Sequence, residues 1–171
     1  MMDESKLLQK LISVSHTKID LNRRLRVLRE FLEQKYYSGG TGDLDTFLKS
    51  ANCSADDAKA LSSLDRDFYK SFTKNNTYPV LNKITKLVNK EEVLHVYVPY
   101  EMSEQEKEKL GSWFKENVNG NLILEIHLDP ALTLGCAFAF KGVYHNYSLK
   151  YFINNNRREI AKLMDRYEKN P

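Results

Sequence analysis

The spacing of apolar residues changes abruptly at residues 90–93, and this change limits what the chain can fold into. Upstream, apolar residues recur mostly at steps of three and four, the period of a helix with one buried face. Downstream, Val93–Val98 begins a series of short runs rich in β-forming residues. The sequence therefore predicts two domains, residues 1–90 and residues 93–171, in an α and α+β arrangement.

The first domain is expected to be an antiparallel bundle of amphipathic helices. A long helix over residues 21–36 ends at the glycine-rich stretch 38–42, whose glycines permit a left-handed turn. Ser54 is a suitable N-cap for a helix that reaches Phe68, and Pro79 suits the first turn of the last helix of the domain. Short connections between amphipathic helices favour antiparallel neighbours.

The second domain is expected to follow the order β-α-β-β-β-α. A capping box at Ser103 and Glu106 opens a charged helix after the first strand. Lys141 and Gly142 are typical of a hairpin tip. A final helix is expected to start near Ser148. The other strands are expected at residues 122–128, 136–140 and 143–147, and the final helix is expected to carry Phe152, Ile153, Ile160, Leu163 and Met164.

The composition is that of an ordinary soluble globular protein. The chain has 171 residues, a net charge of +3 and 42 % hydrophobic residues. This charge is small for a dedicated nucleic-acid-binding domain. The two cysteines, Cys53 and Cys136, are far apart and predict reduced thiols without a disulfide framework. The acidic N-terminus, with Asp3 and Glu4, matches neither a secretory signal nor an import sequence, so we expect a cytosolic protein.

The sequence carries no recognisable motif for catalysis, metal binding or phosphate binding. His95 and His127 fall in predicted strands and could be neighbours, but a metal site needs further ligands. The glycines at 38–42 follow a helix and lack the spacing of a phosphate-binding loop. No nucleophile motif is present. We therefore predict no catalytic residue, no metal site, no cofactor and no small-molecule substrate.

The notable basic cluster of the chain lies in the long helix and has two interpretations. Arg23 and Arg26 lie three residues apart and can share a helix face, whereas Arg24 is expected to point elsewhere. The cluster is either a solvated face with local ion pairs or a patch for RNA or an acidic partner. Tyr36 and Tyr151 belong to adjacent aromatic pairs, in which both rings pack inside or one ring reaches a partner. The candidate partner-binding residues are Arg23, Arg26, Tyr36 and Tyr151.

The segment between residues 123 and 148 contains several short predicted elements, and their order resembles that of a known family. A strand ends in Asp129-Pro130, with Leu132 after it, then comes Gly135, then a hairpin, then Ser148 at the start of the last helix. This order resembles the C-terminal region of the delta subunit of F-type ATP synthase, the oligomycin-sensitivity-conferring protein family. In that family a strand ends in Asp-Pro-x-Leu, followed by two glycines, a hairpin and Asp-x-Ser. The resemblance covers about residues 93–165.

Three positions depart from the family pattern. Leu134 stands where the family has the first of its two glycines, Asn146 where it has an acidic residue, and Tyr147 where glycine is usual. The N-terminal part agrees with the family in being helical and in its place before the strands.

The resemblance implies a stator subunit with no catalytic activity of its own. Delta-type subunits sit on the catalytic head, where the helical domain grips the N-terminal segments of the alpha subunits. The C-terminal domain joins the end of the b-subunit stalk. The resemblance thus implies a role in ATP synthesis and hydrogen ion transport, at the cytoplasmic face of the cell membrane and peripheral to it through the complex. Nucleic acid is not an expected partner of such a subunit.

An alternative function belongs to a different class. A small RNA-binding or ribosome-associated protein would use the basic helix and the small α+β domain. Its weaknesses are the modest net charge and the lack of a clamping glycine loop beside a strand pair.

Gly135 has two interpretations. A lone glycine in an alternating run often marks a bulge or a close approach of two backbones. Otherwise Gly135 is simply a small residue on a crowded face.

Overall fold

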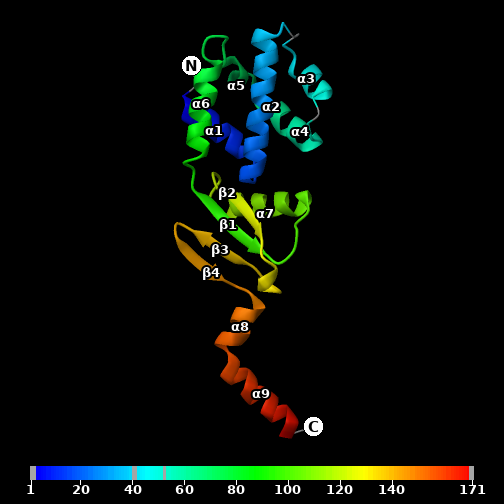
Figure 1. Cartoon of the computed structure of the whole chain (residues 1–171), viewed down its shortest axis with the longest axis vertical. Coiled ribbons are helices and arrows are strands. Elements are labelled where there is room, and N and C mark those ends of the chain that lie inside the picture. Colours follow the sequence, from blue (N-terminus) through cyan, green and yellow to red (C-terminus); the bar gives the residue numbers. More distant parts are fainter. Residues whose placement is uncertain (1–2, 40–41, 52, 170–171) are drawn as a thin grey trace. The chain divides into compact units, whose positions relative to one another are not determined.

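The structure is a computed structural model that describes residues 3–39, 42–51 and 53–169 (Figure 1). It is a mixed α/β structure in which six of the described helices precede the first strand of a four-stranded sheet. Gly40 and Thr41 of the predicted glycine-rich turn lie outside the described residues. The helices are α1 (Glu4–Ser13), α2 (Lys18–Tyr37), α3 (Leu44–Ser50), α4 (Ala55–Ser62), α5 (Arg66–Lys70), α6 (Thr77–Val88), α7 (Glu104–Asn117), α8 (Leu149–Asn155) and α9 (Arg157–Lys169). The strands are β1 (Val93–Val98), β2 (Ile123–Leu128), β3 (Ala137–Phe140) and β4 (Val143–Asn146), and a short 3-10 helix, η1 (Pro130–Leu132), follows β2.

The chain forms two compact units. The first extends to Val93 and also includes Glu104–Leu124, and the second consists of Leu94–Ser103 and the residues from Glu125 onward. Helix α7 thus groups with the N-terminal helices, although the sequence places it in the second predicted domain. Contacts within the first unit explain this grouping. Gly111 of α7 lies against the His16 side chain, and the Lys115 ammonium donates hydrogen bonds to the carbonyls of Ile12 and Ser15.

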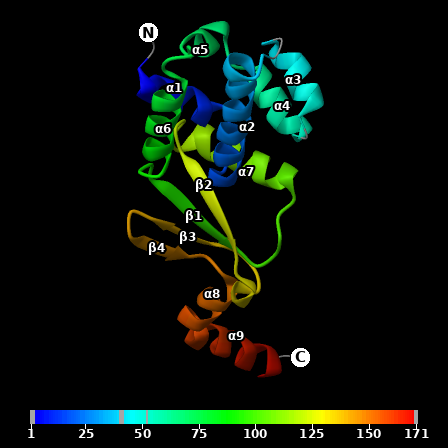
Figure 2. The same cartoon turned by 45° about the horizontal axis from the view of Figure 1, so that its top comes forward.

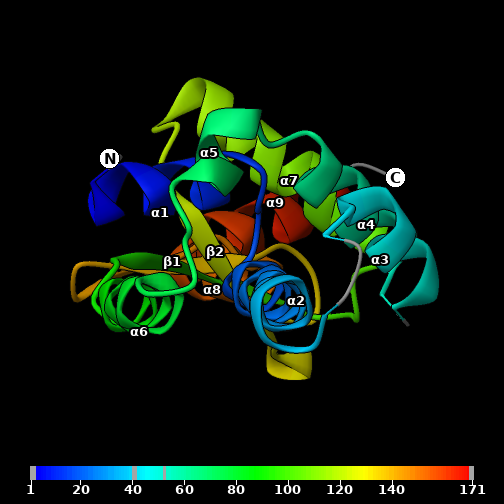
Figure 3. The same ribbon diagram turned by 90° about the horizontal axis from the view of Figure 1, so that it is seen from above.

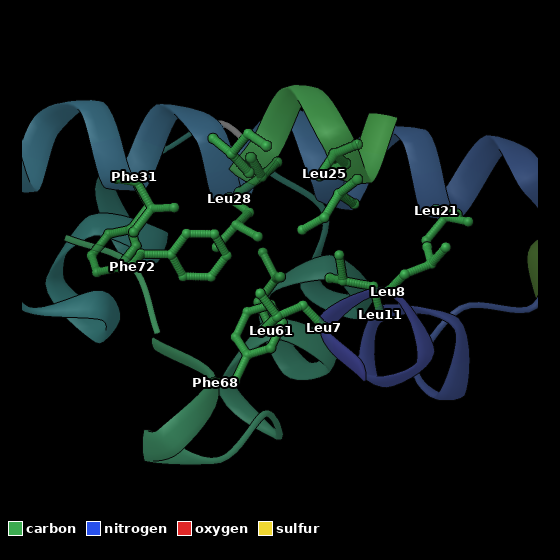
Figure 4. Close-up of a cluster of buried hydrophobic side chains, with 14 of the residues drawn as sticks. Leu7, Leu8, Leu11, Leu21, Leu25, Leu28, Phe31, Leu61, Phe68 and Phe72 are labelled. Atoms are coloured by element: carbon green, nitrogen blue, oxygen red, sulfur yellow. The ribbon is translucent and has the colours of Figure 1, made fainter. Parts of the chain in front are cut away.

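The first unit is built around a core of leucine and phenylalanine side chains. Helices α2 and α6 run antiparallel, and α1 lies across them (Figures 1 and 3). A capping box fixes the start of α2, since the Thr17 hydroxyl accepts from the Asp20 amide at 3.1 Å and the Asp20 carboxylate accepts from the Thr17 amide at 3.2 Å. Figure 4 shows that the core side chains come from segments far apart in the sequence. They include Leu7, Leu8, Leu11, Leu21, Leu25, Leu28, Phe31, Leu61, Phe68 and Phe72.

Two predicted helices are each divided in the structure. The predicted helix from Ser54 to Phe68 is wrong, because the Asp65 carboxylate caps a new helix by accepting from the Phe68 amide at 2.7 Å. The predicted single final helix is interrupted at Asn156, which separates α8 from α9. Asparagine has low helix propensity and favours caps, and three asparagines occupy residues 154–156.

The four strands lie at the predicted places and form a sheet in the order β2-β1-β3-β4. Strand β1 pairs antiparallel with β3, with His95 opposite Ala139. Strands β3 and β4 form a hairpin (Figure 2). Its tip is at Lys141 and Gly142, as predicted, and both residues have positive φ, 50° and 78°. Two successive positive φ values are typical of the tight turn that matches the twist of hairpin strands.

Among the described helices, none combines the length and the apolar character that crossing a lipid bilayer requires.

Candidate functional site

The residues of the Asp-Pro-x-Leu motif form a tight turn after β2. The Asp129 carboxylate accepts a hydrogen bond from the Ala131 amide at 3.0 Å, and the Asp129 amide donates to the Val98 carbonyl at 2.7 Å. Pro130 begins the 3-10 turn, where its fixed φ suits a helical start. Leu132 is buried. The motif therefore redirects the chain from the end of β2 and anchors the turn by one apolar side chain.

Gly135 lies where two stretches of backbone approach each other closely. Its φ is +89°, and a Cβ built on it would contact the Tyr147 carbonyl and lie 3.0 Å from the Ser148 Cα. Backbone hydrogen bonds flank the contact. The Tyr147 amide donates to the Cys136 carbonyl at 2.9 Å, and the Leu149 amide donates to the Leu134 carbonyl at 3.0 Å. The close-approach interpretation of Gly135 is therefore the one that the structure shows.

Ser148 starts helix α8 from a buried position. Its hydroxyl accepts from the Tyr151 amide at 3.2 Å, so it acts as the N-cap of the helix. The Ser148 amide in turn donates to the Asn146 side-chain oxygen at 2.9 Å. Asn146 thus supplies the oxygen acceptor that an acidic residue would supply at the same position. The motif residues between Asp129 and Ser148 build one continuous connection from β2 to α8.

Two arginines of α2, Arg23 and Arg24, converge on a buried carboxylate of α4. Arg23 Nη2 and Arg24 Nε lie 3.1 Å and 3.0 Å from Asp57 Oδ1, and Arg23 Nε also bonds Asp57 Oδ2. Arg23 Nη2 also lies 3.0 Å from Asp20 Oδ1. Burial opposes ionisation of Asp57, but hydrogen bonds from Arg23, Ser54 and Arg24 outweigh it and hold the pKa of Asp57 below its ordinary value. The expectation that Arg24 points away from Arg23 is wrong, because both side chains are long enough to reach the same carboxylate.

A cavity of about 250 Å³ lies beside this ionic cluster in the first unit. Its lining mixes cations and anions, with Arg23, Arg24 and Lys59 facing Asp20, Glu104 and Glu108. Because residues of both charges line it, the cavity presents no single sign of charge to a ligand.

A half-buried lysine and a half-buried histidine connect α7 to the turn between α1 and α2. Burial, with the nearby charge of Arg24, lowers the pKa of Lys115 from its ordinary 10.5 to about 8. Burial, with the charge of Lys115, also lowers the pKa of His16. His16 Nδ1 is buried and makes no hydrogen bond within the described part of the chain. Both groups belong to the packing of α7.

The four candidate partner-binding residues differ in whether their side chains already make contacts within the fold. Arg23 is held by Asp20 and Asp57, and the hydroxyl of the half-buried Tyr36 donates to the Phe72 carbonyl at 2.5 Å. Arg26 and Tyr151 are exposed. The side chains of Arg26 and Tyr151 are thus open to a partner, whereas those of Arg23 and Tyr36 already serve the fold.

The C-terminal helices carry a row of apolar side chains that nothing in the described structure covers. Neither α8 nor α9 buries a side chain among its described residues. In α9 the apolar residues recur at steps of three and four and share one face. Leu163 is 53 % and Met164 61 % exposed. The apolar face of the predicted final helix consists of Phe152, Ile153, Ile160, Leu163 and Met164, of which Ile160 is half-buried and the others are exposed, and the exposed Tyr167 extends it.

Two histidines and a glutamate meet on one face of the sheet. His95 Nδ1 lies 3.0 Å from His127 Nε2 and 3.7 Å from Glu125 Oε2. The expectation that His95 and His127 could be neighbours is confirmed. Glu125 was missed by the sequence reasoning. Its spacing of two residues from His127, which puts both on the same face of one strand, is the signal that identifies it.

No protein-family model matches the chain, and no curated protein matches it.

Proposed function

We propose that the chain is a stator subunit of a rotary F-type ATP synthase. In this proposal it has no catalytic activity of its own and links the catalytic head to the b-subunit stalk. The helices before β1 act as an N-terminal antiparallel bundle, and the segment from β1 through α7 and the other strands to the final helices acts as the small β-α-β-β-β-α domain. The subunit works at the cytoplasmic face of the cell membrane, to which it is attached through the complex.

The observation that carries the proposal is the structure of the connection from β2 to α8. Asp129 caps the turn, Leu132 anchors it, Gly135 permits the close backbone contact and Ser148 caps α8. These are the positions at which the sequence resembles the delta subunit. Each has a defined structural role in this chain, and this supports the proposal.

The departures from the family pattern are compatible with the same connection. Leu134 replaces a glycine, but its side chain is 59 % exposed and needs no space inside the fold. Asn146 replaces an acidic residue and keeps the acceptor for the Ser148 amide. The ring of Tyr147, which replaces a glycine, points to solvent and packs at 5.9 Å from that of Phe138.

The uncovered apolar face of α8 and α9 supports a binding role for the C-terminal part. A large exposed apolar surface with polar residues around it is typical of a protein–protein interface. A helix from the end of a b-subunit stalk would bury these side chains by packing its own apolar face against them. We assign this face to the b subunit and the helical unit to the alpha subunits.

The rival RNA-binding function has less support. It depends on the basic residues of α2, and two of them, Arg23 and Arg24, are already paired with the carboxylates of Asp20 and Asp57. Nucleic-acid binding weakens steeply as salt rises, since it releases counterions, whereas packing of apolar helices does not.

The proposal is tested by expressing the full chain together with the alpha and b subunits of the same organism. We expect the three to copurify, with no ATP hydrolysis by the chain alone. Copurification of the chain with RNA, in the absence of both subunits, would contradict the proposal.

A further inference from the structure

We propose that His95, Glu125 and His127 form a binding site for a divalent transition-metal ion, with Zn²⁺ as the best fit. The ion would connect strand β1 to strand β2. This inference rests on the sheet geometry and is independent of the proposed stator function.

The alternation of the two strands brings the three side chains together. In β1 the even-numbered residues are buried, so His95 and Tyr97 lie on the opposite, half-open face. In β2, Glu125 and His127 are two residues apart and therefore share a face. Because β1 and β2 are neighbours in the sheet, these side chains meet across the strand pair.

The distances suit a tetrahedral ion after small side-chain rotations. One nitrogen or oxygen from each of the three residues can be chosen so that all lie within 4.8 Å of one another. Zinc bonds of about 2.0–2.1 Å place two tetrahedral ligand atoms about 3.3–3.4 Å apart. The distances of 3.0 Å between the imidazole nitrogens and 3.7 Å from His95 to Glu125 lie on either side of this value.

The donor set selects the class of ion. Two imidazoles and one carboxylate are typical zinc ligands, whereas Mg²⁺ and Ca²⁺ prefer shells made of oxygen. The side chains of His95 and Glu125 are 37 % and 33 % exposed, so an ion can enter from solvent. Three protein ligands also leave a fourth position for a water molecule.

Neighbouring residues hold the histidines without blocking the site. The Tyr97 ring stacks on the His127 ring, with centroids 5.0 Å apart and planes at 21°. The Tyr144 ring packs edge-on against Tyr97 at 6.0 Å. The cross-strand partner of His95 is Ala139, whose methyl group leaves room beside the imidazole. Fixed imidazole orientation favours metal binding, because the lone pairs then need little reorganisation.

A direct hydrogen bond between His95 and His127 is the competing arrangement. It would use the same two nitrogens, one as donor and the other as acceptor. An ion bound there would replace this hydrogen bond and join two residues that are 32 positions apart in the sequence. The two arrangements therefore differ in their response to added metal.

The test is calorimetric titration of the full, tag-free, metal-free chain with Zn²⁺. We expect one ion per chain, and at least a tenfold loss of affinity in each of the variants His95→Ala, Glu125→Gln and His127→Ala. The matched control is His145→Ala, since His145 is an exposed histidine of β4 outside the cluster and its removal leaves binding unchanged. We expect no binding of Mg²⁺ or Ca²⁺.

Two further measurements complete the test. Zn²⁺ at a hundredfold excess over its Kd is expected to raise the melting temperature by about 5–10 °C in the parent and not in His127→Ala. Co²⁺ is expected to give the visible absorption bands of a four-coordinate site in the parent only. Melting curves in chelator establish that each variant folds without metal. Absence of Zn²⁺ binding by the parent, or equal binding by His127→Ala, overturns the proposal.

Discussion

Gly135 lies so close to the backbone carbonyl of Tyr147 that no other residue fits at position 135 without a shift of the chain. Two independent constraints act at this glycine. Its φ of +89° disfavours any side chain, and the carbonyl occupies the space that a Cβ would need. The contact joins the segment before β3 to the segment before α8, so this one residue holds the turn after β2 in register with the start of the final helices.

A series of glycine substitutions separates these two constraints. Gly120 has open space around it and an ordinary φ, Gly142 has open space and a positive φ, and Gly135 has a positive φ and no space. We expect Gly135→Ala to lower the free energy of unfolding by about 1–3 kcal/mol, Gly142→Ala by less and Gly120→Ala by least. Thermal and denaturant melts of the three variants measure this order. Equal stability of Gly135→Ala and Gly120→Ala would contradict the close-contact interpretation.

Removal of the carboxylate between Arg23 and Arg24 is expected to weaken the first unit. Asp57→Asn leaves the buried Arg24 without its anion, and a broken buried ion pair of this kind costs about 3 kcal/mol. Asp56→Asn is the matched control, because Asp56 is an exposed neighbour in the same helical turn. Urea unfolding at neutral pH measures both variants. An effect of the same size in both would show that the pairing with the arginines contributes nothing.

The same ion pair predicts a pH dependence at the acid end. The pKa of Asp57 is lower in the folded chain than its ordinary value. Its stabilisation is therefore present above the unfolded-state pKa of about 4 and is lost as pH falls through the folded-state pKa. We expect the stability difference between the parent and Asp57→Asn to shrink as pH falls below about 4. A difference that stays constant over this range would contradict the lowered pKa.

Lys115 predicts a second pH dependence, of the same sense, at alkaline pH. Its pKa in the folded chain is about 8, below the ordinary 10.5. Between these values the unfolded chain binds more protons than the folded chain, so stability rises with pH. We expect the parent to gain stability relative to Lys115→Arg from pH 8 to about pH 10, because arginine stays charged throughout. Parallel stability curves for the two proteins would contradict a lowered Lys115 pKa.

The sequence predicted helices, strands and turns correctly where a few consecutive residues are enough to determine the local structure. The hairpin tip at Lys141 and Gly142, the start of α4 after Ser54 and the strand at Val93–Val98 are such cases. The break before α5 was missed because the apolar stripe of Leu61, Leu64 and Phe68 continues in step across Asp65, the N-cap of α5. An apolar period alone does not show where one helix ends and the next begins.

Contacts between distant residues were not predictable from the same signals. Arg24 and Asp57 are 33 residues apart, and their pairing depends on how α4 packs against α2. The spacing of Glu125 and His127 places both side chains on one face of β2, but their contact with His95 depends on the sheet, which places β2 beside β1. The exposure of Leu163 and Met164 also depends on the tertiary structure. An apolar helix face indicates that the face is buried, but it does not indicate which segment or which partner covers it.

The most direct test of the stator account is the affinity of the full chain for the soluble part of the b subunit. Leu163→Asp combined with Met164→Asp puts two charges on the uncovered face of α9, and we expect binding to the b subunit to weaken by about a hundredfold while alpha-subunit binding is kept. The control combines Arg158→Glu with Lys162→Glu on the opposite face of α9 and is expected to bind like the parent. The account also predicts that the affinity changes little with salt. Failure of the parent to bind the b subunit, or equal binding by the Leu163 and Met164 double variant, would contradict it.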